Sequence, residues 1–349
     1  MKLLCITSVY PTKRNSNLGI FVKRMVEKLT ANGFEVDILL VRPIWKKTNP
    51  VAENVAVLKY LSIPYLSRKF PKINRLLINW SIWYWVRINK EYFNIYDSYY
   101  FKFLYPVSFI IDYLPNKPKV LDMGESFIKD YNEMHISKYV VDFDLIIARN
   151  VRNYNFCISF GAKNVKLISN MAGTNFKKLD RKSCLGALNI NESLLNIGFV
   201  GSKSTRKGYD FFVDLYHNCK GKYEFYNATS DSNDKLGIKN LYIPNEKMQL
   251  FYNAMDIIII PSRFEGSSNV LAEAMACECI IVINKIDELI FDSISYSKLI
   301  IIDIDMEDTI HNLDLIEKSI DNLDLTDMIS SVDRHDKYRE IDLINEVLC

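Results

Sequence analysis

Short apolar runs alternate with longer amphipathic stretches along nearly the whole chain. Runs such as Ile257–Ile260 are apolar at every position, which is typical of a strand buried on both faces of a parallel sheet. This pattern predicts strands at Lys2–Ser8, Glu35–Val41, Val55–Tyr60, Ile95–Phe101, Val120–Asp122, Asp144–Ala148, Asn196–Val200, Tyr223–Tyr226, Leu241–Ile243, Ile257–Ile260, Ile280–Ile283 and Leu299–Ile302. A period near 3.6 predicts helices at Ile20–Ala31, Ile73–Tyr92, Tyr105–Tyr113, Val151–Phe160, Gly208–Asn218, Glu246–Ala254 and Asn269–Cys277.

Two such strand–helix series follow one another, so we expect an α/β protein with two doubly wound, Rossmann-like domains facing each other across a cleft. The chain has 349 residues, which suits two domains of ordinary size. The periodicity lapses between residues 171 and 193, and we place the boundary there. We expect an N-terminal domain over 1–185, a C-terminal domain over 186–330, and a C-terminal helix over 331–349 that could pack back on the first domain.

Composition indicates a cytoplasmic protein. The seven cysteines are scattered, and the one close pair, Cys277 and Cys279, has no second pair to complete a zinc site, so we expect reduced thiols. The chain has no uninterrupted apolar stretch of about 18 residues, so we expect no membrane span.

The first half of the chain carries a concentration of positive charge. Between residues 41 and 90, ten Lys or Arg stand against the single acid Glu53, and all four tryptophans lie between Trp45 and Trp85. Basic amphipathic segments with aromatic residues bind anionic membrane surfaces, so residues 42–90 are a candidate for peripheral contact with the inner face of the cytoplasmic membrane. The alternative is a core helix with an exposed basic side. Nucleic acid is not the expected anion, because no recognised nucleic-acid module accompanies the charge.

A basic loop follows the strand that begins the second series. The strand ends at Gly201, and Lys203, Arg206 and Lys207 precede the helix that starts near Gly208. Amines at the carboxyl end of a strand are well placed to meet a diphosphate. Taken alone, the loop could equally be a solvated basic turn.

A second strand–turn–helix unit lies at residues 257–277. Ser268 or Asn269 can cap the helix, its free N–H groups form an anion site, and Gly266 lets the backbone approach a ligand. Glu265 and Glu273 flank this site, and carboxylates accept hydrogen bonds from hydroxyl groups such as those of a sugar. The alternative is a capped core helix with two surface glutamates.

The segment from Ser262 to Ala276 resembles the signature of retaining glycosyltransferases of the GT-B fold, family 4, with a pattern close to S-R-x-E-G-x-x-N-V-L-x-E-A-M-A. The basic loop is similar to that family's phosphate loop, with Lys207 on its lysine. Residues 10–22 resemble its first glycine loop, and residues 166–176 its interdomain segment, with Asn170 and Phe176 matching. The resemblance covers most of the chain, with its strongest part at 196–290.

The resemblance implies that Lys207 neutralises the donor diphosphate, that Glu265 meets the donor sugar and that Glu273 holds the ribose hydroxyls. It implies that N–H groups of 266–269 cradle phosphate, that the turn at 243–245 lines the base, and that Gly19 closes over the donor. The implied catalytic residues are Lys207 and Glu265; the implied donor-binding residues are Gly19, Gly201, Lys203, Arg206, Gly266, Ser267, Ser268, Asn269, Val270, Glu273, Pro244 and Asn245.

The chain departs from the family pattern in two places. Ser202 stands where the family usually has Arg, so Lys203 or Arg206 is the candidate substitute. Met123 stands where the family often has His, so Glu125 or Asp122 is the first-domain candidate for contacting the donor sugar.

The expected reaction is front-face transfer with retention of configuration, by a hexosyltransferase-type enzyme that needs no metal or cofactor. The substrate would be a UDP- or GDP-linked sugar, and the acceptor a glycan or lipid-linked molecule of cell-surface polysaccharide synthesis, such as capsule or O-antigen. The sequences Asp303-Ile304-Asp305 and Asp142-Phe143-Asp144 are interpreted as solvated turns, and the four histidines lack metal-ligand spacing. Two alternatives remain open: a sugar-nucleotide epimerase, and a catalytically silent protein that binds nucleotide sugars.

Overall fold

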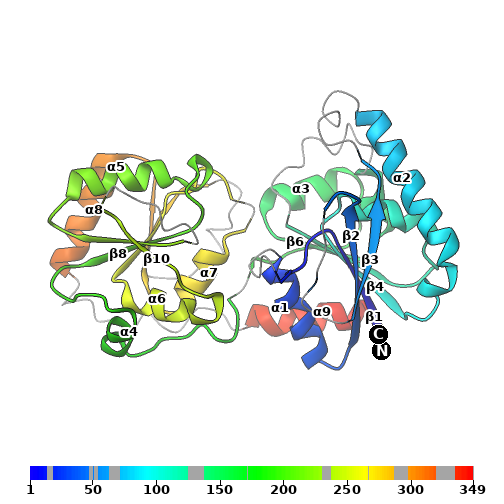
Figure 1. Cartoon of the computed structure of the whole chain (residues 1–349), viewed down its shortest axis with the longest axis horizontal. Helices are drawn as coiled ribbons and strands as arrows, with labels where there is room; N and C mark the ends of the chain where they lie inside the picture. Colours follow the sequence, from blue (N-terminus) through cyan, green and yellow to red (C-terminus); the bar gives the residue numbers. More distant parts are fainter. Residues whose placement is uncertain are drawn as a thin grey trace. The chain divides into compact units, whose positions relative to one another are not determined.

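The computed structural model describes residues 1–13, 19–46, 50, 54–62, 71–124, 137–170, 172–229, 237–265, 267–286, 298–319 and 335–348. Within them the chain forms two compact α/β units, one made of Met1–Ser169 with His335–Cys349, the other of Asn170–Arg334 (Figure 1). Each has a parallel sheet with helices on both faces, so the predicted fold of two doubly wound, Rossmann-like domains is confirmed.

The first unit holds a seven-stranded sheet in the order β3-β2-β1-β4-β5-β6-β7, with every pairing parallel. Its elements are β1 (Lys2–Thr7), α1 (Ile20–Ala31), β2 (Glu35–Pro43), β3 (Val55–Tyr60), α2 (Pro71–Ile88), η1 (Lys90–Phe93), β4 (Ser98–Lys102), η2 (Val107–Tyr113), β5 (Lys119–Met123), η4 (Ser137–Asp142), β6 (Leu145–Ala148), α3 (Val151–Ser159), β7 (Val165–Leu167) and α9 (His335–Leu348).

Alternate residues of these strands pack into two separate cores. Leu4 and Ile6 face one core with α2, η2 and α3, whereas Leu3 and Cys5 face the other with α1 and α9. Because side chains alternate along a strand, apolar residues at successive positions of β1 supply both helix layers. Ile344 and Leu348 of α9 lie in the core with α1, so the C-terminal helix completes the first unit.

The second unit holds a six-stranded parallel sheet in the order β10-β9-β8-β11-β12-β13. Its elements are α4 (Arg181–Leu188), β8 (Asn196–Val200), η5 (Thr205–Lys207), α5 (Tyr209–Cys219), β9 (Glu224–Ala228), β10 (Lys239–Leu241), η6 (Asn245–Lys247), α6 (Met248–Ala254), β11 (Ile257–Ile260), α7 (Asn269–Ala276), β12 (Ile280–Asn284), β13 (Leu299–Ile302) and α8 (Met306–Ser319). Helices α4, α6 and α7 cover one face, and α5 and α8 cover the other (Figure 1).

The compact units divide after Ser169, earlier than the expected domain limit at 185. The physical reason lies in the packing of the intervening stretch: Phe176, Cys184, Leu185 and Ile190 are buried in the core of the second unit. The helix α4 was not predicted, because it is only eight residues long and contains Gly186, a poor helix former.

Candidate functional site

The carboxyl ends of β8 and β11 mark the point where the strand order of the second sheet reverses. The two strands are neighbours, with Ile197 beside Ile257, although several elements separate them in the chain. Ligands of doubly wound sheets bind outside the carboxyl ends of the strands at such a switch point. The basic loop after Val200 and the turn after Ile260, both candidates from their sequence, therefore begin at this point.

The two loops are tied together by backbone contacts. The backbone N–H of Arg263 donates to the carbonyl of Arg206 at 3.0 Å, and the Arg206 guanidinium donates to the carbonyl of Phe264 at 3.2 Å. Gly208 has φ +72°, and a Cβ there would lie 1.9 Å from the carbonyl oxygen of Pro261. Only glycine allows this close approach, so Gly208 sets the spacing of the two loops.

Lys207 and Glu265 form an ion pair across these loops. The Glu265 carboxylate is buried and also accepts a hydrogen bond from the Ser262 hydroxyl at 2.9 Å. Asn284, at the end of β12, donates to the Ser262 carbonyl at 2.8 Å. These contacts hold one ammonium and one carboxylate in fixed positions at the carboxyl ends of three adjacent strands.

The remaining basic-loop candidates lie on the same turn. The Lys203 ammonium lies 5.7 Å from the centroid of the Tyr209 ring, and Gly201 has φ +155° where the chain leaves β8. The Ser202 and Ser204 hydroxyls are 3.1 Å apart. Lys203, Arg206 and Lys207 thus stand on one loop that starts at Gly201.

Helix α7 begins at the same edge of the sheet. The Ser268 hydroxyl caps it by accepting from the Leu271 N–H at 3.2 Å, and Asn269 and Val270 form its first residues. Capping leaves other N–H groups of the first turn available, and the helix dipole makes this end favourable for an anion. Gly266 lies outside the described residues, so its place in the turn stays a prediction.

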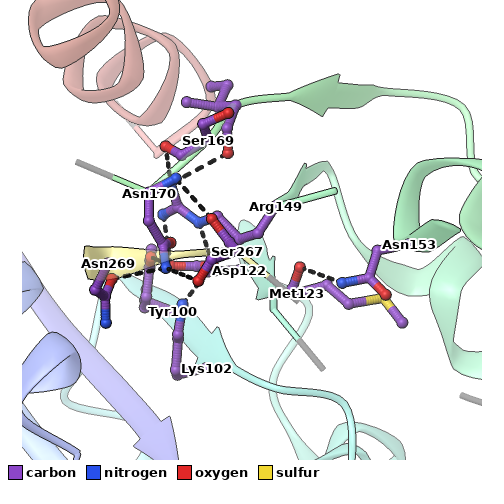
Figure 2. A network of polar contacts seen from close by, with 11 residues as sticks. Tyr100, Lys102, Asp122, Met123, Arg149, Asn153, Ser169, Asn170, Ser267 and Asn269 are labelled. Atoms are coloured by element: carbon purple, nitrogen blue, oxygen red, sulfur yellow. Dashed lines mark hydrogen bonds and ion pairs between the residues drawn. The ribbon is translucent and has the colours of Figure 1, made fainter. Parts of the chain in front are cut away.

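Asn170 binds the start of α7 through three hydrogen bonds (Figure 2). Its backbone N–H donates to the Ser267 hydroxyl at 3.0 Å. Its side-chain amide donates to the Ser267 carbonyl at 3.3 Å and to the Asn269 side chain at 2.9 Å. Asn170 therefore fixes the turn whose N–H groups were predicted to hold phosphate.

Glu273 lies one turn further into α7 and is buried. Its carboxylate accepts a 2.9 Å hydrogen bond from the hydroxyl of Tyr252, on α6. Burial and the negative charge of Glu273 raise the pKa of Tyr252 well above its ordinary value, so this hydroxyl stays protonated and donates. Neither Tyr252 nor Ser262 was predicted as a site residue: Tyr252 lies in no recognised motif, and Ser262 begins the signature that contains Glu265 but was given no contact there.

Pro244 and Asn245 lie at the start of η6, after β10. The Lys247 N–H donates to the Pro244 carbonyl at 2.9 Å and closes this turn. Because β10 is parallel to β8, the turn leaves the same edge of the sheet as the basic loop, two strands away.

In the first unit, Gly19 precedes α1 with φ +77°. A Cβ at this position would lie 2.9 Å from the backbone N and Cα of Tyr10, so the glycine permits close contact within the loop after β1. This loop leaves the carboxyl end of β1, which neighbours β4 at the switch point of the first sheet.

Asp122 is buried near the carboxyl end of β5, and its polar contacts are drawn in Figure 2. Arg149 donates to both of its carboxylate oxygens at 2.7 Å, Lys102 lies 2.6 Å from one oxygen, and the Tyr100 hydroxyl donates to the other at 2.7 Å. Burial alone would raise the pKa of Asp122, but the charges of Arg149 and Lys102 outweigh it and lower that pKa below its ordinary value. These contacts favour a structural role for Asp122 over direct contact with a substrate.

The partners of Asp122 were not predicted from the sequence either. Lys102 ends β4 and Arg149 follows β6, so parallel pairing brings both to the carboxyl edge beside Asp122. The one sequence feature that could have indicated this contact is that both basic residues stand at the carboxyl ends of predicted strands. Glu125, the second first-domain candidate, lies outside the described residues.

Neither a metal cluster nor a membrane-spanning helix is found in the described part of the chain. No group of three or more His, Cys, Asp or Glu side chains there could hold a metal ion. None of the described helices combines the length and apolar character needed to cross a bilayer.

Comparison with known proteins relates the second unit to a glycosyltransferase family. Residues 195–307 match the family model described as Glycosyl transferases group 1, so the second unit carries a domain of that kind. An uncharacterized 41.2 kDa protein in the cps region of Klebsiella pneumoniae is 26% identical over 157 residues. That match covers 42% of this chain and 44% of the relative, so it spans less than half of the relative's length.

Solved structures of GT-B glycosyltransferases share the whole fold. Sucrose-phosphate synthase from Thermosynechococcus elongatus superposes with a TM-score of 0.73 at 14% identity, covering 99% of both chains. Anabaena Alr3699/HepE in complex with UDP superposes with a TM-score of 0.69 at 16% identity, covering 100% of this chain and 99% of that one. Its complex with UDP-glucose gives 0.67 at 16% identity, with coverage of 100% and 98%. At these identities the likeness concerns the two-domain architecture.

Proposed function

We propose that this protein is a retaining glycosyltransferase of family 4, which moves a sugar from a nucleotide-diphosphate sugar to a glycan or lipid-linked acceptor. The observation that carries the proposal is the meeting of Lys207, Glu265 and the capped start of α7 at the β8/β11 switch point. A cation and free helix N–H groups at one sheet edge suit a diphosphate, and nearby carboxylates suit sugar hydroxyls. The group 1 match over 195–307 supports the same assignment.

In the proposed complex, Lys207 and the first turn of α7 bind the donor diphosphate. Glu265 holds Lys207 in place, so the Lys207 ammonium would already be oriented when it binds the diphosphate. Glu273 accepts hydrogen bonds from the ribose hydroxyls, and Glu265 meets the donor sugar. The turn at Pro244 and Asn245 lines the base. Uracil is the first base to test, because Alr3699/HepE was crystallised with UDP and with UDP-glucose.

The proposed chemistry is front-face displacement at the anomeric carbon. The bond between this carbon and the diphosphate oxygen breaks, and a bond to the acceptor hydroxyl oxygen forms on the same face. The acceptor proton passes to the departing diphosphate. Positive charge preorganised where the leaving group develops its negative charge is the main expected catalytic contribution. Lys207 and the helix end supply that charge, so we expect transfer to persist in EDTA.

The proposed role is synthesis of cell-surface polysaccharide, at the inner face of the cytoplasmic membrane. The match to a protein of the Klebsiella pneumoniae cps region supports a capsule-like product. A lipid-linked acceptor would require the enzyme to work next to a membrane.

A panel of UDP- and GDP-sugars, first by thermal shift and then with lipid-linked acceptors, tests the assignment. A transfer product that keeps the anomeric configuration of the donor sugar, as determined by NMR, would support a retaining glycosyltransferase. Epimerised donor would instead indicate an isomerase, and binding without turnover a silent binding protein. Failure of every nucleotide sugar to bind would end the proposal.

Two substitutions sharpen the test. Lys207→Met should weaken donor use by about tenfold to a hundredfold, the value of a charged hydrogen bond of roughly 1.5–3 kcal/mol. Glu273→Gln should also weaken it strongly. The matched control is Lys222→Met, which removes another ion-paired lysine of the same unit: Lys222 lies 2.6 Å from Asp314, just before β9 and so at the opposite edge of the sheet.

A further inference from the structure

Helix α2 has an apolar face on its outer side as well as on its inner side. The inner face is the ordinary one, with Ile78, Ile82 and Val86 buried in the core of the first unit. The outer side chains are between 39% and 63% exposed and are Ile73, Leu76, Trp80, Trp83, Tyr84 and Ile88. A surface helix of a globular protein is normally polar on this side, and an exposed apolar face of this kind is typical of an interaction site.

The outer residues form one continuous stripe. Positions 73, 76, 80, 84 and 87 follow a spacing of three or four, which places them on the same side of a helix. The rings of Trp80 and Tyr84 stack at 5.9 Å, and the Arg87 guanidinium lies 5.6 Å from the Trp83 ring. Large aromatic side chains with a polar end are those preferred at a membrane–water interface.

The charge around the stripe is mostly positive. From residue 71 to residue 88 the helix contains Lys72, Arg75 and Arg87 and no acid, and Lys90 and Glu91 follow it. An anionic lipid surface complements this charge, at about 1 kcal/mol for each nearby Lys or Arg. A second copy of the chain would bring like charges together, which disfavours pairing through the same face.

Exposed apolar side chains continue on the loops beside α2. The Leu61 N–H donates to the Ser81 hydroxyl of the helix at 3.0 Å, and the Ile44 N–H donates to the Tyr60 carbonyl at 2.9 Å. Leu61, Ile44 and Trp45 are themselves exposed. They follow β3 and β2 at the carboxyl edge of the first sheet, the edge at which such sheets bind ligands.

We propose that the outer face of α2 docks on an anionic phospholipid membrane, with the aromatic stripe in the headgroup region and the four cations against lipid phosphates. The helix lies parallel to the surface, since its inner face stays in the protein core. Docking places the carboxyl edge of the first sheet close to lipid-linked molecules. It does not depend on donor binding by the second unit.

Tryptophan fluorescence gives a direct test, because all four tryptophans lie in residues 45–85. Vesicles of phosphatidylcholine with phosphatidylglycerol should bind the protein in a flotation assay and shift its tryptophan emission to shorter wavelength. Vesicles of phosphatidylcholine alone should do so far less, and added salt should weaken the effect. No partitioning into anionic vesicles at low ionic strength would overturn the proposal.

Leu76→Ser should weaken vesicle binding by about tenfold, the loss expected when one leucine no longer enters the apolar phase. Arg87→Gln should weaken it about fivefold at low salt only. The controls are Ile158→Ser, at an exposed aliphatic position of α3 in the same unit, and Lys163→Gln, which removes an exposed positive charge elsewhere on this unit. Equal losses in the controls would overturn the assignment of the stripe.

Two further measurements distinguish membrane docking from self-association and from donor binding. Sedimentation of the lipid-free protein tests whether the stripe pairs two copies; a dimer that Leu76→Ser converts to monomer would reassign the face to self-association. Glu273→Gln should bind vesicles like the parent protein. The membrane surface and the sugar-transfer proposal therefore fail independently.

Discussion

The hydroxyl of Tyr252 donates a 2.9 Å hydrogen bond to the carboxylate of Glu273, and both side chains are buried. The tyrosine comes from α6 and the glutamate from α7, and the helix pair brings the two together although they are 21 positions apart. A carboxylate oriented in this way can present its other lone pairs to hydroxyl groups of a ligand.

Tyr252→Phe should raise the donor dissociation constant by about tenfold, corresponding to roughly 1.5 kcal/mol for a hydrogen bond to a charged group. The change leaves Glu273 charged but less well oriented. Isothermal titration with the donor nucleotide measures the effect. Tyr223→Phe is the matched control, since it removes a 3.0 Å hydrogen bond to the Asp314 carboxylate near the amino edge of the same sheet. Equal donor affinity in Tyr252→Phe and the parent would exclude the orienting role.

The fold could be predicted well from the sequence because many buried strands are uninterrupted apolar runs. Ile257–Ile260 forms β11 as expected, and the helix predicted at Ile20–Ala31 coincides with α1. The prediction failed where burial is slight: β7 has no fully buried residue and was missed. Residues 105–113 were predicted as a helix, and their helical part is the 3₁₀ helix η2.

The loops of the candidate site could be located from the sequence, but their internal contacts could not. Gly208 and Lys207 stood out as a turn and a cation after a strand. The Tyr252–Glu273 hydrogen bond joins two helices and leaves no local sequence pattern, so it could not be predicted. Ser262 and Glu265 lie three positions apart in one turn, but this spacing did not indicate the hydrogen bond between them. Asp122 was predicted as a candidate for substrate contact because the sequence could not reveal its three buried partners.

Gly208→Ala should disrupt the donor site, because its methyl group would collide with the Pro261 carbonyl and force the two loops apart. We expect donor affinity to fall by more than about tenfold. Alanine at a positive φ also costs roughly 1–3 kcal/mol of backbone strain, which lowers the stability of the fold. Gly221→Ala controls for that strain: Gly221 has φ +83° in the same unit, and nothing lies within 4 Å of a Cβ there. Similar donor affinities in the two variants would show that the close approach is unimportant.

Arg149→Met should destabilise the first unit by about 3–5 kcal/mol, because it leaves the buried Asp122 carboxylate without its bidentate partner. Urea unfolding followed by tryptophan fluorescence reports on this unit, which contains every tryptophan. Lys166→Met, at an exposed position of β7, should change the free energy of unfolding by less than about 0.5 kcal/mol. A loss in Arg149→Met no larger than that of the control would contradict the structural role of the pair.

Acid should remove the contribution of Asp122 to stability. Its folded pKa is depressed below the ordinary value of 3.8, so between the two values the unfolded state binds more protons than the folded state. The contribution is therefore complete above the unfolded pKa and is lost as pH falls through the folded one. Urea midpoints from pH 6 downward should fall more steeply for the parent than for Asp122→Asn, which starts less stable at neutral pH. If the urea midpoints of the parent and of Asp122→Asn fell in parallel with pH, the pKa of Asp122 would not be depressed in the folded state.

Asn170→Ala should raise the donor KM about fivefold, near 1 kcal/mol, because Ser267 and Asn269 lose the amide that fixes the first turn of α7. Asn170→Asp should be worse: it has the same shape but cannot donate, and its negative charge would stand beside the diphosphate. A purely structural asparagine would give the two variants similar kinetics and a common loss of stability. Asn164→Ala is the control, since its side chain donates a 2.9 Å hydrogen bond to the Asp144 carbonyl in the first unit, and its donor KM should match the parent's. If the aspartate variant used the donor as well as the alanine variant, the start of α7 would not be the anion site.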